Sequence, residues 1–233
     1  MKKYLIYFLI VAILLTLTSC KQVNTKNESL IKKEIDMIDL EEYLYTKVIK
    51  EIDTWNEKNI YAISFFVYSN EAYTYKNFEN VSIFTISYNT ESACENDDLL
   101  SEERWNYAYW LQDERPIIDP TEDYNEGIEI LFKWYEQNDI KNIGYEDENC
   151  YDNEMNYIGK GPVGYYELLT IVSNVAKRLQ EESYIKNKFG KPIPIIIHDY
   201  EYTWYVIEAT KNANPHGEAD TFIKAMKQLG FID

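Results

Sequence analysis

The stretches Ile60 to Tyr68, IYAISFFVY, and Asn80 to Tyr88, NVSIFTISY, decide the fold class. Both are rich in β-branched and aromatic residues, which is typical of strands, and Ser69-Asn70-Glu71 between them has the composition of a turn. Two strands that follow each other without an intervening helix form an antiparallel pair. These stretches therefore predict the centre of an antiparallel or mixed sheet.

A second pair of apolar runs lies near the C-terminus. Ile193 to Ile197 is continuously apolar and is bracketed at its start by Pro192 and Pro194, which suits a buried strand that begins at a sheet margin. Thr203 to Glu208 is another such run, and the polar residues 198–201 between the two runs favour a turn. We therefore predict that the two runs form a hairpin.

Four segments carry the three- and four-residue apolar spacing of amphipathic helices. The clearest is Tyr165 to Glu182, where the apolar residues form one stripe and Gly164 precedes them. The other three are Leu30–Lys58, Asp123–Gln137 and Ala219–Leu229. Within the first of these, the pattern is stronger from Glu41 onward.

The remaining segments connect these elements. Residues 138–162 have no apolar period and are expected to form a loop, and the NPHG sequence of residues 214–217 is a strong turn signal. Strands occur as neighbours rather than alternating with helices. The sequence therefore predicts a single α+β domain over residues 30–233, with an antiparallel or mixed sheet of about four to five strands packed with three to four helices.

The N-terminus has the layout of a secretory signal. Lys2 and Lys3 precede 14 uncharged, almost wholly apolar residues from Tyr4 to Leu17, and the run ends at Leu17-Thr18-Ser19-Cys20. This tetrapeptide resembles the lipobox of bacterial lipoproteins, in which the cysteine thiol is acylated before cleavage. A transmembrane helix needs about 20 apolar residues. We therefore predict that residues 1–19 are a cleaved signal peptide and that Cys20 carries a lipid.

The segment after the lipidated cysteine is polar. Residues 20–29 are expected to form a flexible tether. Each buried methylene of an acyl chain contributes about 0.8 kcal/mol, so two or more chains make a stable anchor. The expected location is the extracytoplasmic face of the cell membrane, with Cys20 as the point of membrane contact.

The composition is strongly acidic. The chain has 40 acidic and 23 basic residues, and removal of residues 1–19 takes away two lysines and no acid, so the net charge changes from −17 to −19. Such a surface repels nucleic acid and anionic lipid headgroups, which argues against nucleic-acid binding. It either keeps the domain soluble or docks a basic partner. The 22 tyrosines indicate core packing or, alternatively, a groove that stacks on sugars.

Two cysteines remain once Cys20 is assigned to lipid. Cys94 and Cys150 both lie in polar, acidic surroundings, which makes either one a poor nucleophile. Outside the cell, two spare cysteines favour one disulfide. The sequence does not show whether the two segments meet, so the bridged and the free states both stay open.

The candidate catalytic residues are His198, Asp199, Glu201 and His216. These two histidines are the only ones in the sequence, so an imidazole base or imidazole metal ligand must be one of them. The four side chains could hold zinc or another divalent ion through imidazole and carboxylate, although no paired H-x-x-x-H spacing is present. The alternative is a turn in which Asp199 caps backbone amides and His198 is a partly buried hydrogen-bond donor.

Two other segments have candidate binding chemistry. Acidic residues of the loop could bind calcium, although the EF-hand pattern is absent and a solvated loop is the simpler interpretation; they are Glu146, Asp147, Glu148, Asp152 and Glu154. Arg104, Trp105 and Trp110 are of the types that dominate protein interfaces, so they form either a binding patch or an aromatic segment that covers the sheet. No cofactor is expected.

Several words of the sequence are shared with one bacterial family. They are Arg104–Trp110 (RWNYAYW), Gly164–Leu169 (GYYELL) and Ile195–Asp199 (IIIHD), followed by Trp204-Tyr205 and Asn214-Pro215. Over roughly residues 40 to 230 the chain resembles the family known as domain of unknown function 4303. Its members are mostly soluble, and the resemblance implies, for some of them, immunity to a bacterial toxin. The lipobox departs from most members and argues against a cytoplasmic immunity role.

Two hypotheses for the function follow. The first is a non-catalytic, lipid-anchored binding module with a protein partner, of which toxin immunity would be a special case; no recognisable acid/base or nucleophile constellation is present in the sequence. The second is a hydrolase or metal-dependent enzyme centred on His198 and Asp199.

Overall fold

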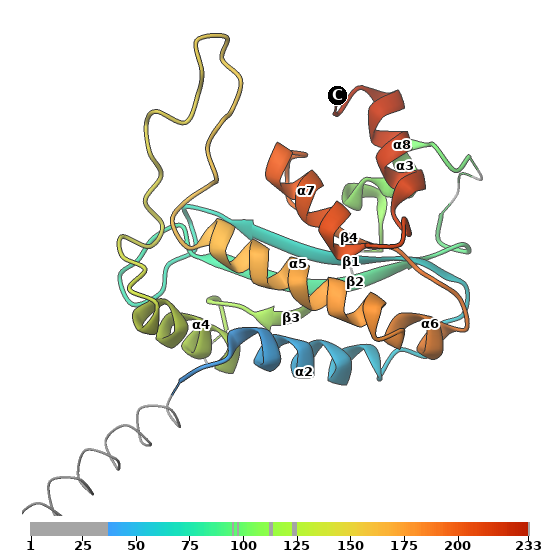
Figure 1. Cartoon of the computed structure of the whole chain (residues 1–233), viewed down its shortest axis with the longest axis horizontal. Coiled ribbons are helices and arrows are strands. Elements are labelled where there is room, and N and C mark those ends of the chain that lie inside the picture. Colours follow the sequence, from blue (N-terminus) through green and yellow to red (C-terminus); the bar gives the residue numbers. More distant parts are fainter. Residues whose placement is uncertain (1–36, 95, 97, 112–113, 123–124, 233) are drawn as a thin grey trace, which may run out of the picture. The chain divides into compact units, whose positions relative to one another are not determined.

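A mixed sheet of four strands forms the centre of the compact unit Asp39–Asp233 (Figure 1). The computed structural model describes residues 37–94, 96, 98–111, 114–122 and 125–232, so the predicted signal peptide, Cys20 and the tether lie outside the described residues. The strands are β1 (Ile60–Ser69), β2 (Ser82–Thr90), β3 (Arg115–Ile118) and β4 (Ile195–His198), in the order β3-β2-β1-β4. β2 pairs antiparallel with β1 and β3, whereas β4 pairs parallel with β1.

Seven α-helices and one 3-10 helix occur among the described residues. They are α2 (Leu40–Ile52), α3 (Glu102–Trp105), η1 (Tyr107–Tyr109), α4 (Glu126–Gln137), α5 (Tyr165–Glu181), α6 (Tyr184–Phe189), α7 (Trp204–Ala213) and α8 (Asp220–Leu229). The predicted α+β class is confirmed. The predicted helices correspond to α2, α4, α5 and α8, and the predicted loop over residues 138–162 contains no helix or named strand. The first part of the predicted Leu30–Lys58 helix, up to residue 36, lies outside the described residues.

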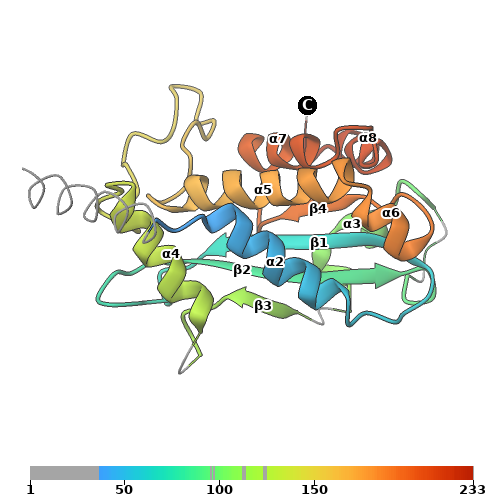
Figure 2. The same ribbon diagram turned by 60° about the horizontal axis from the view of Figure 1, so that its bottom comes forward.

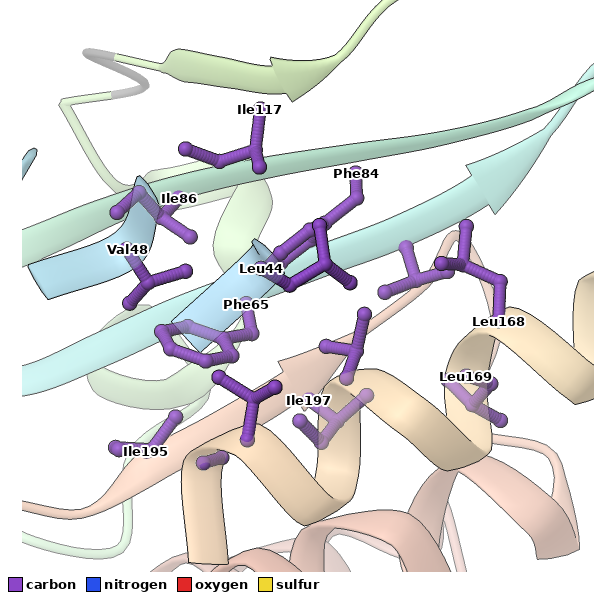
Figure 3. Close-up of a cluster of buried hydrophobic side chains, with 14 of the residues drawn as sticks. Leu44, Val48, Phe65, Phe84, Ile86, Ile117, Leu168, Leu169, Ile195 and Ile197 are labelled. Carbon is purple, nitrogen blue, oxygen red and sulfur yellow. The ribbon is translucent and has the colours of Figure 1, made fainter. Parts of the chain in front are cut away.

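One face of the sheet packs against α2, α4 and α5 (Figure 2). Figure 3 shows Leu44 of α2 and Leu168 of α5 against Phe65 of β1 and Phe84 of β2, all fully buried. These helices expose the apolar stripes that the sequence predicts, and burying such a stripe against a sheet is the main stabilising contribution of this layer.

The opposite face of the sheet packs against α3, η1 and α8. Trp105 and Phe222 of these helices lie in one cluster with Phe66 and Ile196 of the sheet. Because both faces are covered, β1 and β2 are buried along nearly their whole length, which explains why their sequences are continuously apolar and aromatic rather than alternating.

The predicted strand Thr203–Glu208 is wrong, because these residues open helix α7. Tyr205, Val206, Ala209 and Ala213 are buried, and this spacing is helical and continues beyond Glu208. Residues 203–208 taken alone fit a buried strand as well as they fit a helix, because six residues are too few to show which spacing the apolar side chains follow. No hairpin forms, and β4 pairs with the central strand β1 instead.

Helix α7 lies along the outer edge of β4 and hydrogen-bonds to its backbone. Thr210 Oγ1 accepts from the Ile197 amide at 3.0 Å, and Asn214 Oδ1 accepts from the Ile195 amide at 3.0 Å. Asn214 Nδ2 donates to the Ile195 carbonyl at 2.7 Å. Two side chains thus occupy the positions that the backbone of a further strand would fill.

The turn predicted at residues 214–217 is confirmed, with the Gly217 amide donating to the Asn214 carbonyl at 3.1 Å. Among the residues that the structure describes, no helix has the length and apolar character needed to cross a membrane.

Candidate functional site

The predicted site residues His198 and Asp199 lie where β4 ends. His198 is the last residue of β4 and pairs with Phe66 of β1, so its position is fixed by the sheet. Its side chain is only 1% exposed. Asp199 follows at the start of the connection to α7, where the chain leaves the core and reaches the surface.

The His198 imidazole is a neutral core group. Its Nε2 lies 3.1 Å from the Trp105 carbonyl, which can only accept, so Nε2 carries the proton. Nδ1 is then the acceptor for Ser64 Oγ at 2.8 Å. Burial lowers the pKa of His198 to about 4. The ring also packs against Tyr107 and Trp110, so it joins β4, β1 and the aromatic segment.

Ser64 and His198 have the spacing of a nucleophile and its base, but no substrate can reach them. The exposed fraction of Ser64 is 0% and that of His198 is 1%. Nucleophilic catalysis requires the attacking oxygen to contact the substrate. His198 is a hydrogen-bond donor, as in the alternative interpretation, but it is fully buried at the end of β4 and not partly buried in a turn. The geometry gives no support to a hydrolase centred on His198.

Asp199 is the predicted site residue that faces a cavity and has a strongly altered pKa. Its Oδ2 accepts from the Tyr165 hydroxyl at 2.5 Å and its Oδ1 accepts from the Tyr200 amide at 2.7 Å. Burial raises the pKa of Asp199 to about 6 although both hydrogen bonds oppose this shift. The cavity beside it has a volume of about 300 Å³. Its lining residues are Asn106, Tyr107, Asp199, Tyr200, Glu201, Tyr202 and Phe231.

The metal site predicted as an alternative is not assembled. Glu201 lines the cavity beside Asp199, but His216 lies in the exposed turn after α7, where its amide donates to Glu218. Within the described part of the chain, no three His, Cys, Asp or Glu side chains come close enough to hold a metal ion. The same finding covers the acidic residues of the 138–162 loop, which were the candidates for calcium.

The candidate binding residues Arg104, Trp105 and Trp110 are buried. The predicted binding patch is therefore wrong, and the alternative of an aromatic segment that covers the sheet is the one observed. Their exposed fractions are about 5%. The Arg104 guanidinium binds both carboxylate oxygens of Glu91, at 2.9 and 2.7 Å, and lies over the ring of Tyr61. The indoles of Trp105 and Trp110 donate to backbone carbonyls of Leu99 and Arg104.

The two described cysteines are free thiols. Cys94 packs against the aromatic cluster and donates to the Asn96 carbonyl, whereas Cys150 lies in the 138–162 loop. Of the two states that the sequence leaves open, the structure has the free one, without a Cys94–Cys150 disulfide.

A groove that the sequence did not predict lies between the 138–162 loop and helices α7 and α8. It has a volume of about 600 Å³, and we call it the aromatic groove. Its lining residues are Asn156, Tyr157, Tyr202, Trp204, Ile207, Glu208, Lys211, Lys227, Gly230, Phe231 and Ile232. Tyr202 and Phe231, whose ring centroids are 5.4 Å apart, also line the cavity beside Asp199, so the two hollows adjoin.

The 138–162 loop projects from the body of the protein as one wall of this groove (Figure 1). Tyr151 and Tyr157 form an antiparallel bridge, and their ring centroids are 5.3 Å apart. The Trp204 indole donates to the Gly159 carbonyl at 3.2 Å, which ties the loop to α7. Met155 at the far end of the loop is 75% exposed.

Most of the exposed large apolar side chains belong to the 138–162 loop, to residues 200–204 or to residues 229–231, and two of them, Trp204 and Phe231, line the aromatic groove. Those exposed on the loop, at the start of α7 or at the end of α8 are Tyr145, Tyr151, Met155, Ile158, Tyr200, Trp204, Leu229 and Phe231. Carboxylates of the loop and of residues 199–208 accompany them. Contiguous exposed apolar surface with a polar rim marks interaction sites in soluble domains.

Comparison with known proteins adds no assignment. No family model matches the chain. No curated protein and no solved structure shows significant similarity to it either. The resemblance to the domain of unknown function 4303 family therefore stays a prediction, and the function has to be argued from the residues.

Proposed function

We propose that this protein is a lipid-anchored binding module on the extracytoplasmic face of a bacterial membrane, and that the aromatic groove binds a basic, partly apolar segment of a protein partner. The observation that carries the proposal is the exposed aromatic surface of the groove. Trp204, 44% exposed, and Phe231, 41% exposed, line the groove, and Phe231 also lines the adjoining cavity with Asp199 and Glu201. Tyrosine and tryptophan are enriched at the energetic centre of protein interfaces.

The charge of the protein favours a basic partner. The net charge is −17, and acidic side chains accompany the apolar ones on the projecting loop. Glu208 is the carboxylate of the groove lining, where it is paired with Lys211 at 2.7 Å, and Lys227 lines the groove as well. The carboxylates available to a basic partner are those of Asp199 and Glu201 in the adjoining cavity. Lysine and arginine side chains bind carboxylates and also lie over aromatic rings, so both groups of the groove can recognise them.

The inaccessible Ser64–His198 pair supports a binding function over the hydrolase hypothesis. The family resemblance implies immunity to a toxin for some members. In that form of the proposal, the protein partner is the toxin.

The proposed groove is tested by photo-crosslinking in intact cells. A photoreactive phenylalanine at position 204 is expected to crosslink to a protein through a segment that contains lysine or arginine. The same residue at position 78 is the control, because Phe78 is also exposed but lines a different cavity, beside Phe132. With the crosslinked partner purified, Trp204→Ala is expected to weaken binding roughly 30-fold, corresponding to a loss of about 2 kcal/mol. Phe78→Ala is expected to leave the Kd unchanged, and equal effects at the two positions contradict the proposal.

The proposed anchor is tested by changing the predicted lipidation site. Cys20→Ala is expected to yield either released protein or an uncleaved precursor, because the acidic folded surface as a whole is repelled by anionic headgroups and the lipid is the proposed anchor. Membrane and soluble fractions are compared after a high-salt wash. A processed Cys20→Ala protein that stays with the membrane after this wash excludes lipid as the anchor.

A further inference from the structure

Helices α2 and α6 finish at the same end of the molecule (Figure 2). Another cavity, of about 460 Å³, is lined by residues that follow α2 and by residues around the end of α6. It is distinct from the aromatic groove and shares no lining residue with it. Its lining residues are Trp55, Asn56, Glu57, Lys58, Asn59, Ile60, Lys188, Phe189 and Lys191. They come from the α2–β1 connection and from the segment around the end of α6.

The charge of this cavity is opposite to that of the protein. Three lysines and one glutamate line it, in a chain whose net charge is −17. Neither Lys58 nor Lys191 forms a salt bridge within the described residues. Lys188 donates one hydrogen bond to the Asp53 carbonyl at 2.9 Å, which positions its ammonium group and leaves two further N–H donors.

The single glutamate of the cavity is already engaged. Glu57 Oε2 accepts from the Asn56 amide at 3.0 Å. Hydrogen bonds from its own backbone amide and from the Tyr88 hydroxyl lower the pKa of Glu57. The negative charge of Glu57 is thus stabilised by hydrogen bonds within the protein. It offsets only one of the three lysine charges.

An unpaired donor accompanies the lysines. Trp55 is 5% exposed, and its indole N–H has no hydrogen-bond partner within the described structure. A buried donor without a partner is unfavourable, and such groups are rare in native proteins. Trp55 is among the residues that line the cavity, so its indole resonance reports on a ligand bound there.

We propose that this cavity binds a ligand with a phosphate group. Lys58, Lys188 and Lys191 bring three ammonium groups to the lining of one cavity, to which Asn56 and Asn59 also belong. A phosphate group offers several strong acceptor oxygens and up to two negative charges, whereas a single carboxylate leaves most of these donors unused. The volume accommodates a phosphate with an attached small organic group.

The test follows the indole N–H resonances of the full chain in an uncharged detergent, with ¹⁵N-labelled tryptophan. The chain has five tryptophans, and the Trp55 signal is assigned by its loss in Trp55→Phe. Inorganic pyrophosphate at constant ionic strength is expected to shift this signal to saturation. A double variant, Lys58→Gln with Lys191→Gln, is expected to weaken the binding by about tenfold or more, because two charge-assisted hydrogen bonds are removed.

A matched double variant, Lys133→Gln with Lys224→Gln, removes the same charge from exposed positions outside the cavity and is expected to leave the Kd within about twofold. Micelles doped with phosphatidylglycerol form a second arm. A shift in this arm alone identifies a lipid headgroup as the source of the phosphate, and a shift with pyrophosphate identifies a soluble ligand. Absence of a saturable Trp55 shift in both arms, or equal weakening by the two double variants, overturns the proposal.

Discussion

Lowering the pH from about 6.5 to about 4 is expected to destabilise an Asp199→Asn variant by about 2 kcal/mol more than it destabilises the natural protein. Burial lowers the pKa of His198 to about 4. An unfolded chain, with a histidine pKa near 6.5, therefore takes up this proton first. The stability that the neutral imidazole contributes is present above pH 6.5 and is lost as the pH falls towards 4.

Asp199 acts in the opposite direction. Burial raises the pKa of Asp199 from 3.8 to about 6. The folded protein therefore takes up this proton first, and the stability contributed by the protonated carboxyl is present below pH 3.8 and is lost as the pH rises through 6. Between pH 4 and 6 the contributions of His198 and Asp199 to the free energy of unfolding change in opposite directions and largely cancel. Asp199→Asn removes one of the two contributions, so the loss caused by His198 is no longer compensated.

Urea unfolding at several pH values between 6.5 and 4 measures both effects. The matched variant His198→Gln removes the imidazole titration and is expected to lose less stability on acidification than the natural protein does. Exposed carboxylates titrate equally in all three proteins, so the differences between their curves report His198 and Asp199. Parallel curves for the natural protein and Asp199→Asn would falsify this account.

Replacing Gly127 with alanine is expected to lower the free energy of unfolding by about 3 kcal/mol, although the same change inside a helix ordinarily raises it by about 1 kcal/mol. Gly127 is a buried residue in the first turn of α4. A Cβ atom at this position would lie 2.0 Å from the Ile117 carbonyl oxygen, which belongs to the backbone of β3. α4 and β3 would have to move apart to relieve this overlap.

Gly190→Ala is the matched control. Gly190 ends α6 with φ +75°, and a Cβ atom there meets nothing within 4 Å. Its expected cost is limited to the left-handed backbone conformation, about 1 kcal/mol. Chemical unfolding of both variants distinguishes steric overlap from backbone strain, and a Gly127→Ala protein as stable as the natural one contradicts the close packing of α4 on β3.

The helices and central strands were predictable because their apolar periods are local properties of the sequence. α5, with its single stripe from Leu168 to Leu179, and β1 with β2 are of this kind. The run at 203–208 was misjudged because a short apolar segment fits a buried strand and a helix equally well. Extending the pattern to Ala209 and Ala213 would have revealed the helical spacing of α7.

The candidate site was predicted less well because it depends on burial and on contacts between distant segments. His198 is identifiable as one of two histidines, but its full burial results from packing against Trp105 and Tyr107, some 90 residues earlier in the chain. Trp204 was assigned to a buried strand, so its exposure at the start of α7 was missed. The groove itself exists only where the 138–162 loop meets α7 and α8.

The side-chain hydrogen bonds from α7 to β4 also decide how this protein behaves at high local concentration. An edge strand with free backbone donors and acceptors is a template for pairing with a neighbouring chain, and this pairing leads to aggregation. Thr210 and Asn214 occupy the outward groups of β4. The other edge strand, β3, has only four residues and includes Pro116, which has no amide to donate. Molecules that meet at high local concentration would therefore present one sheet edge whose outward groups are occupied and another that is short and lacks one amide donor.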